Sequence, residues 1–239
     1  MAGHSKWHNI KHKKGAKDAQ RGKLFMKLAK EIYVAAKEGG TDIETNSALR
    51  LAVDKAKSNN MPNDNIERAI NKASGNLDGE NYEEIIYEGY GPEGVAVMVK
   101  TLTDNKNRTA SEVRHAFSKN NGNLGENGCV SFMFQRKGYI VIKKEHVDED
   151  EETFMLVAIE AGCEEVEAND EVYEIFTTVE DFENVRNELQ QSYPIEAAEL
   201  TMFPDTYTSV SEEQQDHMSK LIDMLEDSDD VQEVYHNME

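Results

Sequence analysis

The segment Val172–Met202 reads VYEIFTTVEDFENVRNELQQSYPIEAAELTM. Its first six residues have the β-branched and aromatic side chains that are typical of a strand. Phe182, Val185 and Leu189 then recur at the three- and four-residue spacing of a helix that buries one face. Ile195–Met202 predicts a second strand. A strand, a helix and a strand in direct succession indicate a unit of mixed α and β structure.

The residues before this segment complete the unit. Tyr139–Lys143 predicts a strand, Glu151–Ala161 a buried helix, and Glu164–Glu167 the first strand of a hairpin that turns at Asn169-Asp170. The resulting order, βαββαβ, is the ferredoxin-like pattern. We therefore expect an acidic, ferredoxin-like α+β domain over residues 137–204.

Further strands and helices are predicted on both sides of this unit. Upstream are strands at Tyr82–Glu88 and Val95–Leu102, a helix opened by a capping box at Thr109–Glu112, and a strand at Cys129–Phe134. Downstream are a helix at Ser211–Asp227 and a strand at Val231–Tyr235. The upstream half lacks a second helix and strand, which the downstream pair supplies. We expect a discontinuous α+β middle domain, residues 80–136 plus 205–239, into which 137–204 is inserted.

The first part of the chain is predicted to be helical. Asp18–Lys37 and Thr45–Asn59 have helical periodicity, and a third helix follows Pro62, where Asp64–Glu67 has the pattern of a capping box. Residues 1–79 therefore form a helical, basic N-terminal domain. The expected fold class is α+β with three domains, one helical and two α+β (ferredoxin-like), one of these inserted in the other.

The net charge of −21 is distributed unevenly along the chain. Taken as one number it argues against binding to nucleic acid, because like charges repel. Residues 1–40, however, hold ten Lys and Arg against three Asp and Glu, whereas residues 145–239 hold two against thirty. A basic beginning and an acidic second half indicate contact with nucleic acid at the basic end.

Trp7, the only tryptophan, stands between Lys6 and His8 in the basic segment. An exposed ring among lysines suits stacking on an unpaired base, while Lys and Arg neutralise phosphates. Two other interpretations stay open. The lysines decorate a solvated face with Trp7 packed on the helices, or the basic beginning associates with the acidic half of the protein.

Two loops have a composition that favours anions. The first, Asp104–Thr109, presents Lys106 and Arg108 before a predicted helix N-terminus, so it is either an anion site or an ordinary polar turn capped by Thr109. The second, Asn120–Gly128, resembles a phosphate loop only in its glycines, since it lacks the GxxxxGK[ST] motif. A flexible turn is the expected structure there.

Other classes of protein are disfavoured. No apolar run approaches the roughly 20 residues that span a membrane, and the N-terminus lacks the apolar core of a secretory signal. Cys129 and Cys163 are far apart and are expected to be reduced thiols in the cytoplasm. His4, His8 and His12 share a spacing of four, but no nearby acid or thiol completes a metal site. We expect no catalytic residue, no cofactor and no metal, and therefore no enzyme.

Four segments resemble the YebC/PmpR family. These are Met1–Trp7 with Asn9-Ile10, Phe25–Ala36, Tyr87–Pro92, and Thr103–Ser111 with Val113-Arg114. The resemblance covers essentially the whole chain. It implies a three-domain cytoplasmic protein that regulates gene expression without catalysis. Members are described as DNA-binding transcriptional regulators, and others act as translation factors at the ribosome.

The function that we expect is a nucleic-acid-binding regulator, by resemblance a DNA-binding regulator of transcription. The first alternative is a ribosome-associated RNA-binding translation factor, and the second is a protein–protein adaptor that contacts basic proteins through the acidic half. The expected nucleic-acid-binding residues, from charge and from resemblance together, are His4, Ser5, Lys6, Trp7, His8, Lys11, Lys13, Lys14, Lys17, Arg21, Lys23, Lys106, Arg108 and Arg114.

Overall fold

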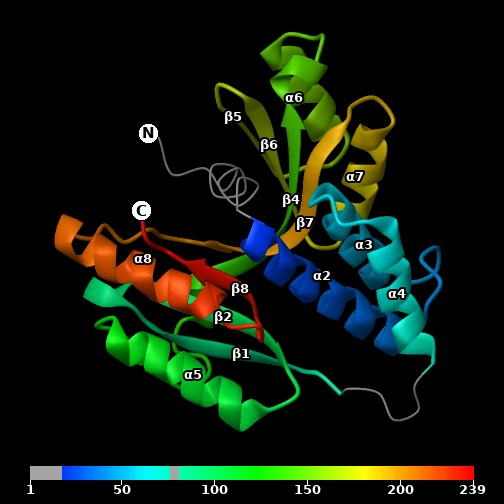
Figure 1. The fold of residues 1–239 in the computed structure, drawn as a ribbon. Coiled ribbons are helices and arrows are strands. Elements are labelled where there is room, and N and C mark those ends of the chain that lie inside the picture. The colour runs from blue at the N-terminus through cyan, green and yellow to red at the C-terminus, as the bar shows by residue number, and fades with distance from the viewer. Residues whose placement is uncertain (1–17, 76–80) are drawn as a thin grey trace.

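The computed structural model describes residues 18–75 and 81–239. Three helices come first, then two antiparallel sheets with their helices (Figure 1). The helices are α2 (Asp18–Gly39), α3 (Ser47–Ser58), α4 (Asn63–Ser74), α5 (Lys106–Lys119), α6 (Glu151–Glu160), α7 (Phe182–Gln190) and α8 (Glu212–Glu226). The strands are β1 (Glu83–Tyr90), β2 (Ala96–Thr103), β3 (Asn123–Leu124), β4 (Phe134–Lys143), β5 (Glu165–Ala168), β6 (Val172–Thr177), β7 (Ile195–Pro204) and β8 (Val231–His236).

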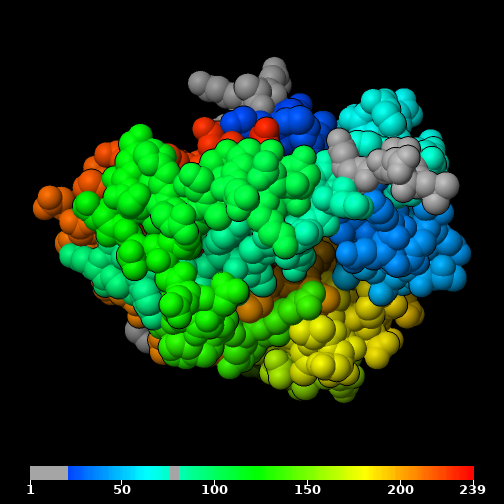
Figure 2. All heavy atoms as spheres, turned by 90° about the horizontal axis from the view of Figure 1, so that it is seen from below, coloured from blue at the N-terminus to red at the C-terminus, as the bar shows by residue number. Residues whose placement is uncertain are grey.

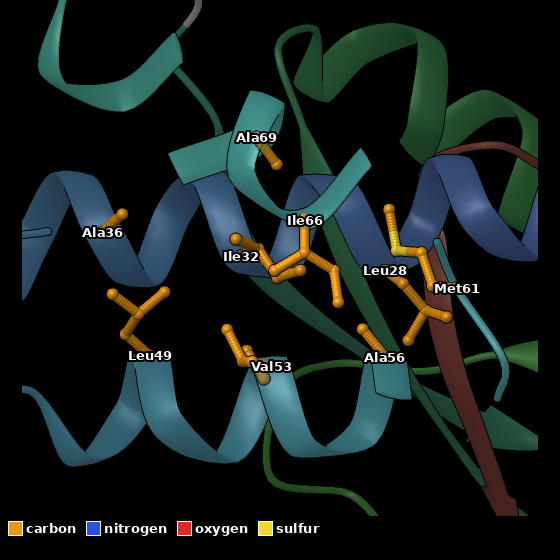
Figure 3. Packing of buried hydrophobic residues seen from close by; sticks show 10 residues of the cluster. Leu28, Ile32, Ala36, Leu49, Val53, Ala56, Met61, Ile66 and Ala69 are labelled. Atoms are coloured by element: carbon orange, nitrogen blue, oxygen red, sulfur yellow. The ribbon is translucent and has the colours of Figure 1, made fainter. Parts of the chain in front are cut away.

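The three N-terminal helices pack around a small apolar core. Leu28 and Ile32 of α2 meet Leu49 and Val53 of α3, and Ile66 of α4 closes the core from the other side (Figure 3). Each helix therefore buries the face that its apolar spacing predicted, which confirms the helical character of this region.

The predicted capping box at Asp64–Glu67 is wrong. Helix α4 begins at Asn63, and its N-cap residue is Pro62, which makes no side-chain capping bond. Proline has its φ fixed near the helical value, here −60°, so the chain enters the helix before Asp64 is reached. In α3, by contrast, the Asn46 side chain accepts a hydrogen bond from the Leu49 amide and sets the start of the helix.

The first sheet has the strand order β3-β1-β2-β8, and α5 and α8 cover one of its faces. The hairpin of β1 and β2 turns at Gly91–Gly94, and β8 pairs antiparallel with β2. The last strand of the chain thus joins a sheet that begins at residue 83. This pairing is the one that a middle domain in two segments requires, and the boundaries 80–136 plus 205–239 stay a prediction.

The second sheet has the order β5-β6-β4-β7, with every neighbouring pair antiparallel. Helices α6 and α7 pack on one face through Phe154, Phe182, Val185 and Leu189. The chain order βαββαβ is the predicted one. Strand β4 is longer than predicted, because it begins at Phe134 rather than Tyr139.

The strand predicted at Cys129–Phe134 is wrong. This segment forms a turn and a short 3-10 helix, Ser131–Met133, before β4 begins. The backbone N–H groups of Gly128, Val130 and Ser131 all donate to the carboxylate of Glu88. Donors that converge on one side chain are not available to a neighbouring strand, so the ladder does not form.

Helix α3 lies where the three parts of the molecule meet. Its Lys55 Nζ lies 3.0 Å from Glu31 of α2 and 2.6 Å from Glu233 of β8. Arg50 and Asp54 of the same helix pair with Glu183 and Arg186 of α7. Figure 2 shows the surface hollowed between the green, blue and yellow regions.

Within the described ranges, no helix is both long and apolar enough to cross a membrane.

Candidate nucleic-acid interface

Most of the predicted nucleic-acid-binding residues lie outside the described residues. They are His4, Ser5, Lys6, Trp7, His8, Lys11, Lys13, Lys14 and Lys17, and the histidine spacing at His4, His8 and His12 lies there too. The remaining candidates are Arg21 and Lys23 on α2, and Lys106, Arg108 and Arg114 on α5.

The lysines of α2 reach toward the end of α8 and the turn that follows it. Lys23 Nζ pairs with Asp227 at 2.7 Å, and Lys27 Nζ donates to the backbone oxygen of Glu226 at 2.6 Å. Lys30 Nζ donates to the backbone oxygen of Asp229 at 2.9 Å. Cations near a helix C-terminus complement its dipole. These three lysines of α2 therefore join the helical region to the first sheet and its helices.

The Asp104–Thr109 loop, one of the two candidate anion sites, contains an anion that belongs to the chain itself. The carboxylate of Asp230 is buried against it, and four side chains converge on this group. Asp230 Oδ2 lies 2.6 Å from Arg108 Nη2, 2.9 Å from Thr109 Oγ1 and 3.2 Å from Thr103 Oγ1, while Asp230 Oδ1 lies 3.2 Å from Lys30 Nζ. We call these five residues the Asp230 centre.

The protonation states of the Asp230 centre follow from its contacts. Burial raises the pKa of Asp230, but hydrogen bonds from Arg108 and Thr109, together with Lys30, outweigh it and leave that pKa below its usual range. The hydrogen bond to Asp230 is also the main reason that the pKa of Arg108 is raised. A second carboxylate, Asp104, binds Arg108 at 2.7 Å. Arg108 is thus engaged by two carboxylates of its own chain.

The predicted cap at Thr109 is wrong for a related reason. The N-cap of α5 is Asn105, whose side chain accepts from the Arg108 amide at 3.1 Å. Helix α5 therefore begins at Lys106, three residues before the predicted Thr109. The Thr109 hydroxyl is turned inward, toward Thr103 and Asp230.

The second glycine-containing loop, Asn120–Gly128, also meets an internal carboxylate. Glu88 on β1 accepts from the amides of Gly128, Val130 and Ser131 at 2.8 to 2.9 Å. Burial raises the pKa of Glu88, and the three backbone hydrogen bonds outweigh it, so that the pKa is lowered. The amides that could hold a phosphate therefore hold Glu88.

The outer face of α5 presents several exposed basic side chains. Arg114, His115 and Lys119 are exposed, and Arg114 makes no ion pair within residues 18–75 and 81–239. Lys106, more than half exposed, pairs with Glu83 at 2.5 Å. Helix α5 lies on the surface at one end of the molecule, in the green region turned to the viewer in Figure 2. We call Lys106, Arg114, His115 and Lys119 the α5 face.

The polar residues of this helix also repeat at helical spacing. Asn107, Ser111, Arg114 and Ser118 are exposed and recur every three or four residues, so they line one stripe. Such a stripe can place hydrogen-bonding groups along a groove of nucleic acid, with Arg114 at its centre. On α2, Arg21 is exposed at the end nearest the undescribed basic segment.

Sequence reasoning missed His115, Lys119, Asp230 and Glu88. His115 and Lys119 could have been found, since both fall on the polar side of α5 once its apolar positions Val113, Ala116 and Phe117 are marked. Asp230 and Glu88 could not, because their partners are distant in the chain. Arg108 to Asp230 spans 122 positions and Glu88 to Val130 spans 42.

The described residues offer no grouping of His, Cys, Asp and Glu that could hold a metal ion. Both thiols are free, and burial raises the pKa of Cys129 and of Cys163. A raised pKa keeps a thiol protonated and weakly nucleophilic.

Comparison with known proteins covers nearly all of the chain. Residues 5–76 match the family described as "TACO1/YebC protein N-terminal domain", and residues 82–238 match "TACO1/YebC second and third domain". A "Probable transcriptional regulatory protein" of Anoxybacillus flavithermus is 63% identical over 100% of this chain and 98% of its own. The "Probable transcriptional regulatory protein YrbC" of Bacillus subtilis is 60% identical over 99% of each.

A solved structure is also similar. The crystal structure of the conserved hypothetical protein Aq1575 from Aquifex aeolicus shares 50% sequence identity with this chain and has a TM-score of 0.82. The likeness covers 93% of this chain and 91% of the other. The fold over nearly the whole chain is therefore similar in the Aquifex aeolicus protein.

Proposed function

The chain belongs to the TACO1/YebC family, and from this premise we propose that it is a nucleic-acid-binding regulator of gene expression, acting in the cytoplasm on DNA and without a catalytic step. The relatives' name, "Probable transcriptional regulatory protein", supports this proposal. The α5 face, where Arg114, His115 and Lys119 are exposed around a polar stripe, is the single structural observation that carries it.

The division of the cations supports the same proposal. Lys23, Lys30 and Arg108 contact carboxylates of the same chain, so their contribution to phosphate binding is small. Phosphate contacts then fall to the α5 face, to Arg21, and to the basic residues between His4 and Lys17. A protein that neutralises several phosphates binds with a steep dependence on salt.

Binding of a labelled DNA duplex to the full chain, followed by fluorescence anisotropy over a range of salt concentrations, tests the proposal. We expect the logarithm of the binding constant to fall linearly with the logarithm of the salt concentration, with a slope of about −0.9 for each phosphate that the protein contacts. Arg114→Gln combined with Lys119→Gln should reduce affinity roughly tenfold, since two phosphate or base contacts are lost. Arg136→Gln combined with Lys57→Gln removes two exposed cations, of β4 and α3, so it is matched in charge and should change little.

RNA is the second candidate, and Trp7 between Lys6 and His8 favours it, because an aromatic ring among cations stacks well on unpaired bases. A structured RNA with a single-stranded loop, titrated in the same buffers, separates the two. If the RNA binds more tightly than the duplex at every salt concentration, the target is RNA, and a role at the ribosome replaces the role in transcription. If neither binds, the function proposed here is wrong.

A further inference from the structure

Helix α6 is apolar on all of its sides. Its central residues, Phe154–Ile159, are all apolar, and six successive residues of a helix point in every direction around its axis. A helix of this kind is normally buried on every side. The sequence accordingly predicts a buried helix at Glu151–Ala161.

The structure buries only one side of α6. Phe154 and Ala158 are fully buried, whereas Leu156 is 61% exposed and Ile159 is 56% exposed. Met155, beside them on the helix, is partly exposed. Helix α6 lies at the periphery of the molecule in Figure 1. The prediction of a buried helix is therefore wrong for its outer side, and we call Met155, Leu156 and Ile159 the α6 apolar face.

A hollow lies beside the α6 apolar face, between the C-terminal ends of α6 and α7. Its volume is about 300 Å³, and its lining combines the apolar Val157 and Leu189 with the carboxylates of Glu160 and Glu188. Glu160 follows Leu156 by one helical turn, so the two side chains are neighbours on the surface of α6. A partner that covers the α6 apolar face can therefore place a side chain in the hollow.

Carboxylates surround both the α6 apolar face and the hollow. Glu152 and Glu160 lie one turn before and one turn after Leu156, and Glu188 lies across the hollow on α7. All three glutamates are exposed, and none forms an ion pair with a residue in the ranges 18–75 and 81–239. The apolar side chains are thus bordered by negative charge that no described cation pairs with.

Two lysines lie at the ends of α6, and both are paired with other carboxylates. Lys144 lies 2.9 Å from Glu151 in the first turn of the helix, and Lys137 lies 3.7 Å from Glu164 beyond its last turn. Arg186, the cation of α7, is buried and pairs with α3. The carboxylates that border the α6 apolar face are therefore available to the cations of a partner.

We propose that the α6 apolar face is a docking site for a basic, amphipathic helix of another protein. The apolar side chains of that helix cover Leu156 and Ile159, and its Lys and Arg side chains meet the bordering glutamates. Charge complementarity selects the partner, because a neutral or acidic helix would leave these carboxylates unpaired and nucleic acid would be repelled. A helix fits the surface because the apolar side chains of α6 form a ridge that packs into the groove of a second helix.

The α6 apolar face and the α5 face belong to different sheets and lie at opposite ends of the molecule in Figure 1. The two surfaces can therefore be occupied at the same time. A chain that holds nucleic acid with one and a basic protein with the other would join the two, and this consequence rests on the function proposed above. The docking of the basic helix does not depend on that function.

Titration calorimetry of the full chain with a synthetic helix of Leu and Lys, its leucines at heptad positions a and d, tests the docking. Leu156→Gln combined with Ile159→Gln keeps the net charge and introduces a good helix former at both positions. We expect this variant to bind the peptide about tenfold more weakly, because the apolar area that the peptide covers is lost. Met26→Gln combined with Phe132→Gln removes apolar side chains that are 56% and 72% exposed elsewhere, and this matched control should bind like the unaltered chain.

A second pair of variants tests the carboxylates. Glu152→Gln combined with Glu160→Gln should weaken binding of the peptide about threefold, as expected for the loss of exposed ion pairs, and high salt should remove the difference. Glu212→Gln combined with Glu213→Gln changes the net charge equally at exposed positions of α8, and it should have little effect. A helix of the same pattern built from Leu and Glu should not bind.

Equal affinities of the Leu156→Gln, Ile159→Gln variant and its control would overturn the proposal, because the peptide would then bind the negative charge of the chain at large. No binding to the unaltered chain, or equal binding of the Leu and Glu helix, would overturn it as well. Self-association of the unaltered chain that this variant abolishes in sedimentation would assign the face to a second copy instead. These measurements contain no nucleic acid, so the docking and the function proposed above can fail separately.

Discussion

Arg108 and Arg114 lie six positions apart in α5 and have opposite surroundings. Arg108 is held by Asp104 and by the buried Asp230, and so it links α5 to the turn before β8. Arg114, less than two turns further along, is exposed and makes no ion pair within the described ranges. The two residues are equally basic, and only their environments differ.

The difference shows which positive charges are available to a ligand. Lys23, Lys30, Lys55 and Arg108 each contact a carboxylate of another part of the chain. Lys23, Lys30 and Lys55 join the helical region to the first sheet and its helices, Arg108 joins α5 to the turn before β8, and we call these four the anchoring cations. Among the remaining cations, the α5 face, Arg21 and the basic N-terminal residues are the ones that we assign to nucleic acid.

Among substitutions at the contacts of the anchoring cations, Asp230→Ala is expected to lower the free energy of unfolding the most. The substitution leaves Arg108 and Lys30 without their shared carboxylate and removes the acceptor of Thr109. Loss of one partner from a largely buried ionic cluster costs about 3 kcal/mol, somewhat less than for a fully buried one, because Arg108 is partly exposed. Urea unfolding should show this loss.

Asp229→Ala is the control for that change. Asp229 is exposed and contributes only its backbone oxygen, which the substitution keeps. Its free energy of unfolding should stay within about 0.5 kcal/mol of the unaltered chain. Equal losses in the two variants would contradict a role for the Asp230 carboxylate.

Lys55→Met should have the next largest effect. Burial lowers the pKa of Lys55, but the charges of Glu233, Glu31 and Glu199 outweigh it and raise that pKa, so the residue is charged and central to the junction. Removing it leaves three carboxylates facing one another. We expect a loss of about 2 kcal/mol in chemical unfolding, discounted because Lys55 retains some exposure. Lys57→Met, at an exposed position of the same helix, should cost little.

Glu88→Gln should reduce stability by about 1–2 kcal/mol, because an amide cannot accept from all three backbone donors as a carboxylate does. The effect should depend on pH. The pKa of Glu88 is lowered in the folded protein, so its contribution is present above the unfolded pKa and is lost as the pH falls below about 4.

The acid-unfolding curve measures this dependence. The unaltered protein and Glu88→Gln should differ in stability near neutral pH and converge in acid. Glu84→Gln, at a more exposed position of the same strand, is the control. A difference that persists at low pH would show that packing, rather than charge, holds the loop.

The smallest effect is expected for Lys23→Ala. Its partner Asp227 is largely exposed, and exposed ion pairs contribute little to stability. Thermal unfolding should show no measurable change. A clear drop in Tm would mean that the outer end of α2 is held as firmly as the Asp230 centre, and would weaken the division between anchoring and open cations.

Much of the fold could be predicted from the sequence where the pattern is local. Strand β6 has the predicted bounds, and α2, α6, α7 and α8 lie within a few residues of their predictions, because each shows its burial in its own spacing. The failures occur where a partner is distant. The Glu88 carboxylate accepts hydrogen bonds from amides after Asn127, so these amides do not pair in a strand. The Thr109 hydroxyl donates to Asp230, and Asn105 rather than Thr109 caps α5.

The candidate site follows the same rule. A count of Lys and Arg placed the basic charge in the first 40 residues, and charge is a property that composition reports. Which of these cations face outward is decided by contacts between residues far apart. Lys30 and Asp230 are 200 positions apart, and no spacing reveals them. The polar side of α5 could be read from its spacing, but that Arg108 is engaged by Asp230 while Arg114 stays exposed could not.

A side-by-side comparison of Arg108→Gln and Arg114→Gln tests the central claim most directly. Duplex binding by fluorescence anisotropy and urea unfolding would be measured on both full chains. We predict that Arg108→Gln lowers the free energy of unfolding by about 1–2 kcal/mol and, at temperatures where it is folded, changes affinity little. Arg114→Gln should keep the stability and weaken binding about three- to tenfold. Equal losses of affinity in both variants, or none in Arg114→Gln, would contradict the account.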